Sequence, residues 1–439
     1  MSDRLAIVNA TAILVDDDAT VLRDATLVIA DDGSIRAIGD RTITHDASEV
    51  IDARGGIVMP GLINAHTHLA MTLFRGLADD ITLEDFLARL MPAEFAVLSP
   101  EAVAAGTRLA ALESLRGGIT TALDMYYLPE SIVEVAGSTR MRIHTGPTLL
   151  EFDGPERLAF DARLAWAKRW LERAQSAGDA QSLWLGPHST YLMGDDHLRR
   201  TASLAREHGA RIHVHAAETR GEMQQVAQRH GGRSPIEVLR DTNLLDRAVL
   251  AHGVHLSDSD IDLVAGANAT VVHCPASNYK LASGFARITD LVRAGANVAL
   301  GTDGPASGND LDLWLAMRLA GYGQKNVAGD PTVLPAHDIV RMATINGAKA
   351  LGIDHLVGSL EVGKRADVIV LDADSPSLTP AFDPHVAIAA SAGRGDVLHV
   401  VIDGEPVVRN RVTLTIDAAT TLADAAKYAE TVRSSVNPA

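Results

Sequence analysis

The sequence predicts an α/β protein organised around a barrel, with a small β unit contributed by both chain ends. Three observations support this prediction. Apolar strands alternate with helical stretches between about residues 60 and 350, titratable residues follow several of these strands, and short strands without a helical period occupy both ends. We therefore expect residues 60–359 to form a barrel domain, and residues 1–59 and 360–439 to form one discontinuous β-sandwich domain.

The first part of the chain consists of short apolar runs separated by turn residues. Strands are expected at residues 5–8, 12–15, 25–29 and 35–38. Asp32-Gly33 lies between two of these runs, which is typical of a hairpin turn. These residues predict a small β module.

The central part alternates between helix and strand. The helix expected over residues 100–116 has Ser99 as its N-cap and ends at Gly117-Gly118. Further helices are expected at 155–177, 195–208, 221–229, 257–265, 288–294 and 336–351. Strands are expected at 57–63, 119–123, 141–149, 182–185, 211–214, 248–250, 270–272 and 298–300.

This alternation predicts a parallel sheet of about eight strands. A doubly wound sheet would alternate in the same way, but it gathers its ligands at one switch point. Here polar residues follow many strands, and a barrel places its active site at the rim formed by the carboxyl ends of its strands. The distribution therefore favours a barrel.

The last part of the chain returns to β character at residues 363–371 and 399–404. Each chain end is too small to build its own core, so we expect the two ends to pack together. Residues 418–432 are expected to be helical, with no assigned role.

Composition limits the class of protein. The net charge is −17 and no basic cluster interrupts the acidic background, which argues against nucleic-acid binding. No apolar run approaches the roughly 18 residues of a membrane span, and the N-terminus does not resemble a secretory signal. The only cysteine, Cys274, cannot form an intramolecular disulfide. We expect a cytoplasmic protein with no membrane partner.

A His-X-His motif follows the strand of residues 57–63. Alternate side chains of an extended segment point the same way, so His66 and His68 project together while Thr67 points away. Two imidazoles could then meet one metal ion, although an isolated His-X-His also occurs at surfaces and in cores. The pair alone is therefore a weak signal.

Other strands end in residues of the same kind. His215 follows an apolar strand and Glu218 comes three residues later, which would supply a ligand and an acid/base group from one loop. Glu218 could also be a solvated residue at a helix start. His213 shares the face of His215, but His215 lies nearer the loop and is the preferred candidate.

His252 and Asp303 each end a further apolar strand. Three imidazoles and one carboxylate suit one Zn²⁺ ion, with Fe²⁺ and Mn²⁺ as alternatives. Such an ion lowers the pKa of a bound water towards about 7 and so supplies hydroxide at neutral pH. No phosphate-binding loop, serine elbow or redox cysteine pair competes with metal-assisted hydrolysis.

Taken together, these motifs resemble those of the amidohydrolase superfamily. They are PGLINAHTH at 60–68, HAAET at 215–219, Ala251-His252, HCPASN at 273–278 and GTDG at 301–304. The resemblance implies a distorted (β/α)₈ barrel with a β-sandwich. It also implies a single divalent metal held by His66, His68, His215 and Asp303.

The resemblance further assigns the catalytic steps. His252 would hydrogen-bond the metal-bound water and Asp303 would accept its proton. Glu218 would carry a proton to the ring nitrogen beside the attacked carbon, and ammonia would leave.

Within the superfamily, residues 71–80, 91–94, 124–126 and 188–191 resemble S-adenosylhomocysteine/methylthioadenosine deaminases. This resemblance assigns ribose contacts to Glu94 and His188, places Ser307 near the base, and offers Arg142 for a homocysteine carboxylate. From residue type alone, Glu94 and His188 could equally be solvated loop residues. Phe86 stands where these deaminases often have Trp.

The expected function is hydrolytic deamination of an adenosine derivative, giving the inosine analogue and ammonia. Candidate substrates are S-adenosylhomocysteine, methylthioadenosine, 5′-deoxyadenosine and adenosine. The alternative is an aminohydrolase or chlorohydrolase acting on guanine, 8-oxoguanine, a pterin or an s-triazine. A non-catalytic metal-binding barrel is a third possibility, and a homo-oligomer is compatible with each.

Overall fold

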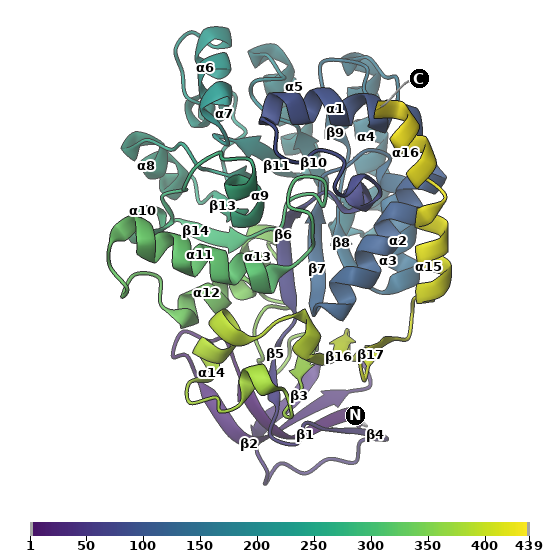
Figure 1. Cartoon of the computed structure of the whole chain (residues 1–439), viewed down its shortest axis with the longest axis vertical. Coiled ribbons are helices and arrows are strands. Elements are labelled where there is room, and N and C mark those ends of the chain that lie inside the picture. Colours follow the sequence, from purple (N-terminus) through teal and green to yellow (C-terminus); the bar gives the residue numbers. More distant parts are fainter. Residues whose placement is uncertain (1–2, 437–439) are drawn as a thin grey trace.

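The computed structural model describes residues 3–436, which form an α/β body with a β-rich region at one end (Figure 1). The β-rich region contains one nine-stranded sheet in the order β18-β17-β16-β15-β5-β1-β2-β3, with β4 paired to β1. Its strands are β1 (Asp3–Ile13), β2 (Val21–Ala30), β3 (Ile35–Asp40), β4 (Glu49–Asp52), β5 (Ile57–Pro60), β15 (Val368–Leu371), β16 (Val397–Ile402), β17 (Glu405–Arg409) and β18 (Val412–Thr413).

The two chain ends meet where β5 pairs antiparallel with β15, with Met59 opposite Ile369. Alternating apolar residues of β1, β2 and β15 form a separate buried cluster on one face of this sheet. The prediction that both chain ends build one β unit is confirmed.

The body contains parallel strands arranged as two sheets, β14-β13-β12-β11-β10-β9 and β6-β7-β8. These strands are β6 (Leu62–Thr67), β7 (Ile119–Asp124), β8 (Arg142–His144), β9 (Thr148–Leu149), β10 (Trp184–Pro187), β11 (Arg211–Ala216), β12 (Val249–His252), β13 (Thr270–His273) and β14 (Asn297–Leu300).

Two junctions connect the sheets. β8 and β9 are halves of one interrupted strand, since β8 pairs with β7 and β9 pairs with β10. At the other junction, the Asp303 amide donates to the His66 carbonyl at 3.1 Å and Asn64 bonds Thr302 at 2.7 Å. Counting β8 and β9 as one, the body has eight strands, as the distorted barrel prediction requires.

Helices follow the strands and surround them (Figure 1). They are η1 (Leu69–Phe74), α1 (Leu83–Val97), α2 (Pro100–Arg116), α3 (Pro129–Thr139), α4 (Phe160–Ala177), η2 (Ala180–Ser182), α5 (Asp195–His208), α6 (Arg220–Arg229), α7 (Pro235–Asp241), α8 (Asp258–Gly266), α9 (Pro275–Lys280), α10 (Ile288–Arg293), α11 (Leu313–Ala328), α12 (Ala336–Met342), α13 (Ile345–Leu351), η3 (Pro376–Leu378), α14 (Pro384–Val386), η4 (Ala387–Ser391) and η5 (Arg394–Asp396). The helix expected over 336–351 is two helices, because Thr344 leaves the helical region with φ −136° and ψ −99°.

The last two helices differ from the domain prediction. α15 (Ala418–Ala426) packs against α2, and α16 (Ala429–Val436) packs against α1. Figure 1 shows both along the side of the body, away from the β-rich end. Val432 joins the buried cluster that contains Phe86 and Leu90 of α1, so burial of this apolar contact places the C-terminal segment on the barrel.

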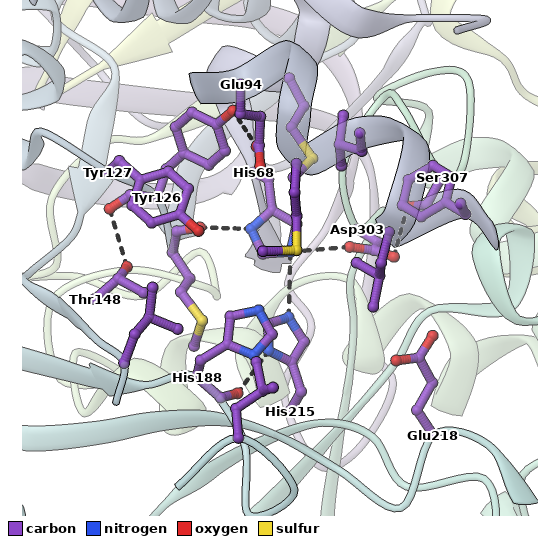
Figure 2. A pocket seen from close by; sticks show the side chains of 18 of the residues that line it. His68, Glu94, Tyr126, Tyr127, Thr148, His188, His215, Glu218, Asp303 and Ser307 are labelled. Carbon is purple, nitrogen blue, oxygen red and sulfur yellow. Dashed lines mark hydrogen bonds and ion pairs between the residues drawn. The ribbon is translucent and has the colours of Figure 1, made fainter. Parts of the chain in front are cut away.

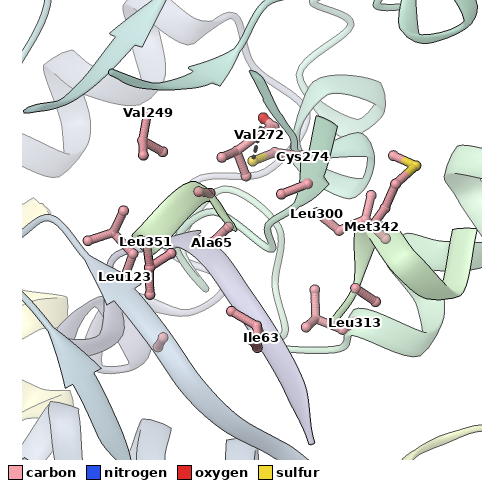
Figure 3. Packing of buried hydrophobic residues seen from close by; sticks show 14 of the residues in the cluster. Ile63, Ala65, Leu123, Val249, Val272, Cys274, Leu300, Leu313, Met342 and Leu351 are labelled. Atoms are coloured by element: carbon pink, nitrogen blue, oxygen red, sulfur yellow. Dashed lines mark hydrogen bonds between the residues drawn. The ribbon is translucent and has the colours of Figure 1, made fainter. Parts of the chain in front are cut away.

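The interior of the body is a packed apolar core (Figure 3). It contains Ile63 and Ala65 of β6, Leu123 of β7, Val249 of β12 and Leu300 of β14. Strands anchored in this way hold the residues at their carboxyl ends in fixed positions.

Among residues 3–436, no single helix is long and apolar enough to cross a membrane. The two helical segments Asp85–Val97 and Pro100–Arg116 have, taken together, the length and composition of a membrane span, but they are bent by 118° relative to each other.

Candidate active site

A cavity lies at the carboxyl ends of the barrel strands. His68, Glu94, His188, His215, Glu218, His252, Asp303 and Ser307 are among the residues that line it. Figure 2 shows His68, His215 and Asp303 pointing toward one another, with Glu218 directed into the same space. The structure thus brings these sequence-predicted residues together.

β6 presents His66 and His68 on one side, as its alternation predicts. His66 Nδ1 lies 2.7 Å from His213 Nε2, and His68 Nδ1 lies 2.5 Å from the Met125 carbonyl. These contacts leave the Nε2 atoms of His66 and His68 facing Asp303 Oδ1, at 3.4 and 3.2 Å. His213, which shares a face of β11 with His215, therefore supports His66 from behind.

His215 is oriented by its Nδ1 atom, which lies 2.8 Å from the His188 carbonyl. Its Nε2 lies 3.2 Å from that of His68. Burial lowers the pKa of His215 well below its ordinary value and lowers that of His66 to about 3. Both imidazoles are therefore neutral at pH 7, the form that binds metal ions.

Asp303 is buried and held by several donors. Its Oδ2 accepts from Ser277 Oγ at 2.7 Å and Ser307 Oγ at 2.6 Å, while Oδ1 accepts from the Gly304 amide at 2.7 Å. Burial opposes ionisation, but the neighbouring imidazoles of His66 and His68 hold the pKa of Asp303 well below its usual range. Asp303 is thus a carboxylate at neutral pH. Its φ of 60° is left-handed, a strained conformation that occurs at functional sites.

Glu218 and His252 lie close together in the same site. His252 Nε2 is 3.6 Å from Glu218 Oε2, and His252 Nδ1 is 3.0 Å from Asn278 Nδ2. The side chain of Glu218 is buried rather than solvated at the helix start. This proximity pairs a carboxylate with an imidazole inside the cavity.

Glu222 is a site residue that the sequence reasoning missed. Its buried carboxylate accepts from the amides of Ala217 and Glu218 at 2.9 and 2.6 Å. Burial raises the pKa of Glu222 to about 7. Ala217 has a φ of 57°, so Glu222 stabilises a strained turn that presents Glu218. The four-residue spacing of Glu218 and Glu222 at the start of α6 was the sequence signal that could have identified Glu222.

The donor set fits a divalent metal ion. Ligand atoms of His66, His68 and Asp303 lie within 4.8 Å of one another, as do those of His66, His215 and His252. His66 belongs to both groups, and its buried Nε2 has no hydrogen-bond partner. A cation among these atoms would satisfy that nitrogen and separate the closely spaced imidazoles.

Three of the four residues predicted to contact substrate line the cavity. Glu94 of α1, His188 after β10 and Ser307 line the same cavity. Glu94 is buried and accepts from the Tyr126 hydroxyl at 2.6 Å. Burial raises the pKa of Glu94 to about 7 and lowers that of His188 to about 3. Both are fixed groups of a pocket rather than loosely solvated side chains.

The prediction for Arg142 is wrong. Arg142 begins β8, at the strand end opposite the cavity, and its guanidinium binds Asp403 at 2.9 Å and Asp367 at 3.3 Å. Both aspartates belong to the β-rich region. Arg142 therefore joins the barrel to the β unit and cannot reach a substrate in the cavity.

Comparisons with known proteins agree with this architecture. Residues 57–407 match the amidohydrolase family. The chain is 38% identical over 436 residues to a 5′-deoxyadenosine deaminase of Methanosarcina mazei, covering 99% of both chains. It is 41% identical over 435 residues to a 5-methylthioadenosine/S-adenosylhomocysteine deaminase of Halobacterium salinarum, covering 98% of both.

A solved structure shares the whole fold. An adenosine deaminase of Xanthomonas campestris with bound zinc superimposes with a TM-score of 0.94 at 34% identity, over 98% of this chain and 99% of that one. Zinc-bound atrazine chlorohydrolase of Arthrobacter aurescens gives a TM-score of 0.87 at 25% identity, over 97% of this chain and 100% of that one. The match over 57–407 and the identities across nearly the full length show that this chain belongs to the amidohydrolase family.

Proposed function

We propose that this protein is a metal-dependent hydrolase that deaminates an adenosine derivative to the inosine analogue and ammonia. The observation that carries the proposal is the meeting of Glu218 and His252 with the buried donor set of His66, His68, His215 and Asp303 in one cavity. The names of the curated relatives support the same reaction.

The metal is proposed to be a single Zn²⁺ held by His66, His68, His215 and Asp303. Three imidazoles and one carboxylate match the ligand preference of zinc, and the relative from Xanthomonas campestris holds zinc. When bound, the ion lowers the pKa of water and supplies a nucleophile at neutral pH.

The protein residues would manage the protons. Asp303 is ionised and accepts the proton of the attacking water at a carboxylate oxygen. Glu218 delivers a proton to the ring nitrogen beside the attacked carbon, and His252 Nε2, 3.6 Å from Glu218, orients the water. Asp303 then passes its proton to the amino group, the C–N bond breaks and ammonia leaves, and the remaining hydroxyl proton returns to Glu218 as the carbonyl forms.

Two further groups of the cavity would bind the sugar. Glu94, fixed by Tyr126, and His188 supply a carboxylate and an imidazole that suit ribose hydroxyls. Ser307 lies beside Asp303 and is proposed to sit near the base.

A substrate panel tests the proposal. Zinc-loaded protein is incubated separately with adenosine, 5′-deoxyadenosine, methylthioadenosine and S-adenosylhomocysteine, while released ammonia and the change of adenine absorbance are measured. We expect deamination of at least one substrate, loss of turnover after chelation, and recovery on adding zinc. No turnover with any of the four by protein shown to contain zinc would reject the proposal.

An aminohydrolase or chlorohydrolase acting on another heterocycle is the second candidate. The similarity to atrazine chlorohydrolase supports it, because the same hydrolytic chemistry serves several rings. Release of ammonia from guanine, or of chloride from a chlorotriazine, without deamination of adenosines would favour it.

A further inference from the structure

The wall of the cavity beyond its polar groups is apolar. α1 contributes Phe86, Leu87, Leu90 and Met91, and the segments after β9 and β10 contribute Phe152 and Leu192. Figure 1 shows α1 lying across the carboxyl ends of the strands, so this helix covers the mouth of the barrel. These side chains therefore form the apolar part of the cavity wall.

In the part of the chain that the structure describes, the cavity wall contains carboxylates and histidines but no lysine or arginine. The carboxylates are Glu94, Glu218 and Asp303, four histidines gather around the proposed metal site, and no Lys or Arg among residues 3–436 lines the cavity. Leu83 and Glu84 of α1, whose side chains are not described, are not basic. Within the described residues, the wall away from the proposed metal site therefore offers no lysine or arginine to pair with an anionic substituent.

Two basic residues near the cavity are already engaged. Arg163 is buried behind the wall, where it pairs with Glu156 at 2.8 Å and bonds the Asp153 carbonyl at 2.6 Å. Lys280 pairs with Asp79 at 2.6 Å. Recruiting either one would break an existing ion pair.

The position of a nucleoside in the cavity follows from its chemistry. The reacting C6 and the 5′ carbon lie at opposite ends of the molecule. If C6 meets the metal site and Glu218, and the ribose meets Glu94 and His188, the 5′ substituent is left to the apolar wall.

We infer that this cavity selects adenosine derivatives whose 5′ substituent is neutral and apolar over those carrying a zwitterionic amino acid. This inference rests on the proposed function. A methylthio group or a bare methyl group would gain contact with leucine, phenylalanine and methionine side chains. The homocysteine carboxylate and ammonium would lose water against the apolar wall without a matched partner, because no Lys or Arg of residues 3–436 lines the cavity.

The test compares kcat/KM for 5′-deoxyadenosine, methylthioadenosine and S-adenosylhomocysteine at the same zinc loading. We expect the first two to exceed the third by about 100-fold, the scale on which an unpaired buried polar group separates substrates. Equal or higher kcat/KM for S-adenosylhomocysteine would overturn the inference and leave the proposed deamination standing. No turnover with any of these three substrates or with adenosine would reject both the inferred selectivity and the proposed deamination.

Paired variants test the cause. Leu87 and Leu192 are half-buried on the wall, and each is replaced separately by Arg and by Gln. Both replacements remove apolar contact, but only Arg supplies a cation. We expect Leu87→Arg or Leu192→Arg to raise the ratio of S-adenosylhomocysteine to methylthioadenosine turnover about 10-fold above the matched Gln variant. If the Arg and Gln variants give the same turnover ratio at both positions, with unchanged zinc content, the missing cation is not the cause of the selectivity.

Discussion

Glu222 is expected to control catalysis without touching substrate. Its two carboxylate oxygens hold the amides of Ala217 and Glu218, at 2.9 and 2.6 Å, inside the protein. Replacement of Glu222 by Ala leaves both amides buried without acceptors. Replacement by Gln leaves one acceptor oxygen and turns an NH₂ group toward the other amide.

The magnitude follows from these two hydrogen bonds. Each unsatisfied buried donor costs about 1–3 kcal/mol, so Glu222→Ala should lower the free energy of unfolding by about 4 kcal/mol and Glu222→Gln by about half of that. The φ of 57° at Ala217 is a strained conformation that these bonds stabilise. Relaxation of this turn by about 1 Å would displace Glu218 and lower kcat about 100-fold.

The assay combines urea unfolding, kcat with the best adenosine substrate, and zinc content, at about pH 8, where Glu222 is ionised. Glu237→Ala is the matched control, because Glu237 also accepts from a backbone amide, that of Ser234 at 2.8 Å, but caps α7 away from the cavity. The control should lose about 1 kcal/mol of stability and keep its kcat. A normal kcat in the Glu222→Ala enzyme would refute the positioning role. An equal loss of kcat in the Glu237→Ala control would refute it as well.

Three further predictions concern single residues. Glu218→Gln should keep zinc and lose about 10²–10⁴-fold in kcat, because it removes a proton-transfer group and no proposed ligand; near-normal turnover with full zinc content contradicts this. Burial raises the pKa of Glu94 from 4.5 to about 7, so between these pH values the folded protein keeps a proton that the unfolded chain releases. The contribution of this group to the free energy of unfolding is therefore full below about pH 4.5 and is lost as the pH rises through 7. Glu94→Gln can still accept from Tyr126 and should remove about 3 kcal/mol of this pH dependence, measured by urea unfolding at several pH values; an unchanged slope would disprove the assignment. Arg142→Ala should lower the unfolding free energy by about 3–5 kcal/mol, because Asp367 is left buried without its guanidinium, and should leave the substrate preference unchanged; an altered kcat/KM ratio between methylthioadenosine and S-adenosylhomocysteine would restore Arg142 to substrate binding.

Local sequence signals were sufficient for much of the barrel. The helix expected at 100–116 has these bounds in the structure, because Ser99 caps its first turn and Gly117 follows its last residue. The helix expected at 195–208 is also found there. Where such end signals are strong, element bounds follow from neighbouring residues alone.

The meeting of His66, His68, His215, His252 and Asp303 was predictable for a different reason. Each lies at or just after the carboxyl end of an apolar strand, and parallel strands in one barrel bring those ends to one rim. The same rule argues against Arg142 as a substrate contact. It precedes its apolar strand, so it lies at the opposite rim, and strand direction was the signal that the resemblance-based assignment overlooked.

Long-range packing explains what the sequence did not reveal. α1 was not predicted as a helix, although Thr82 caps it, because Pro92 interrupts its pattern. Its buried face packs with Val432 of α16, a residue more than three hundred positions away, and no local pattern connects the two. The packing of α15 and α16 against the barrel could not be predicted for the same reason.

Chemistry and selectivity therefore depend on different parts of this chain. The proposed metal ligands, Glu218 and His252 are placed by strands embedded in the barrel core, so their arrangement depends on the most rigid part of the fold. The apolar wall depends on α1, which is held over the mouth by contacts with α16 and the residues around Phe74. Substitutions within α1 or α16 can thus change which 5′ substituent fits while the hydrolytic centre stays intact. Related barrels that act on other heterocycles are consistent with this separation, since the same hydrolytic centre can serve different rings when the surrounding wall changes.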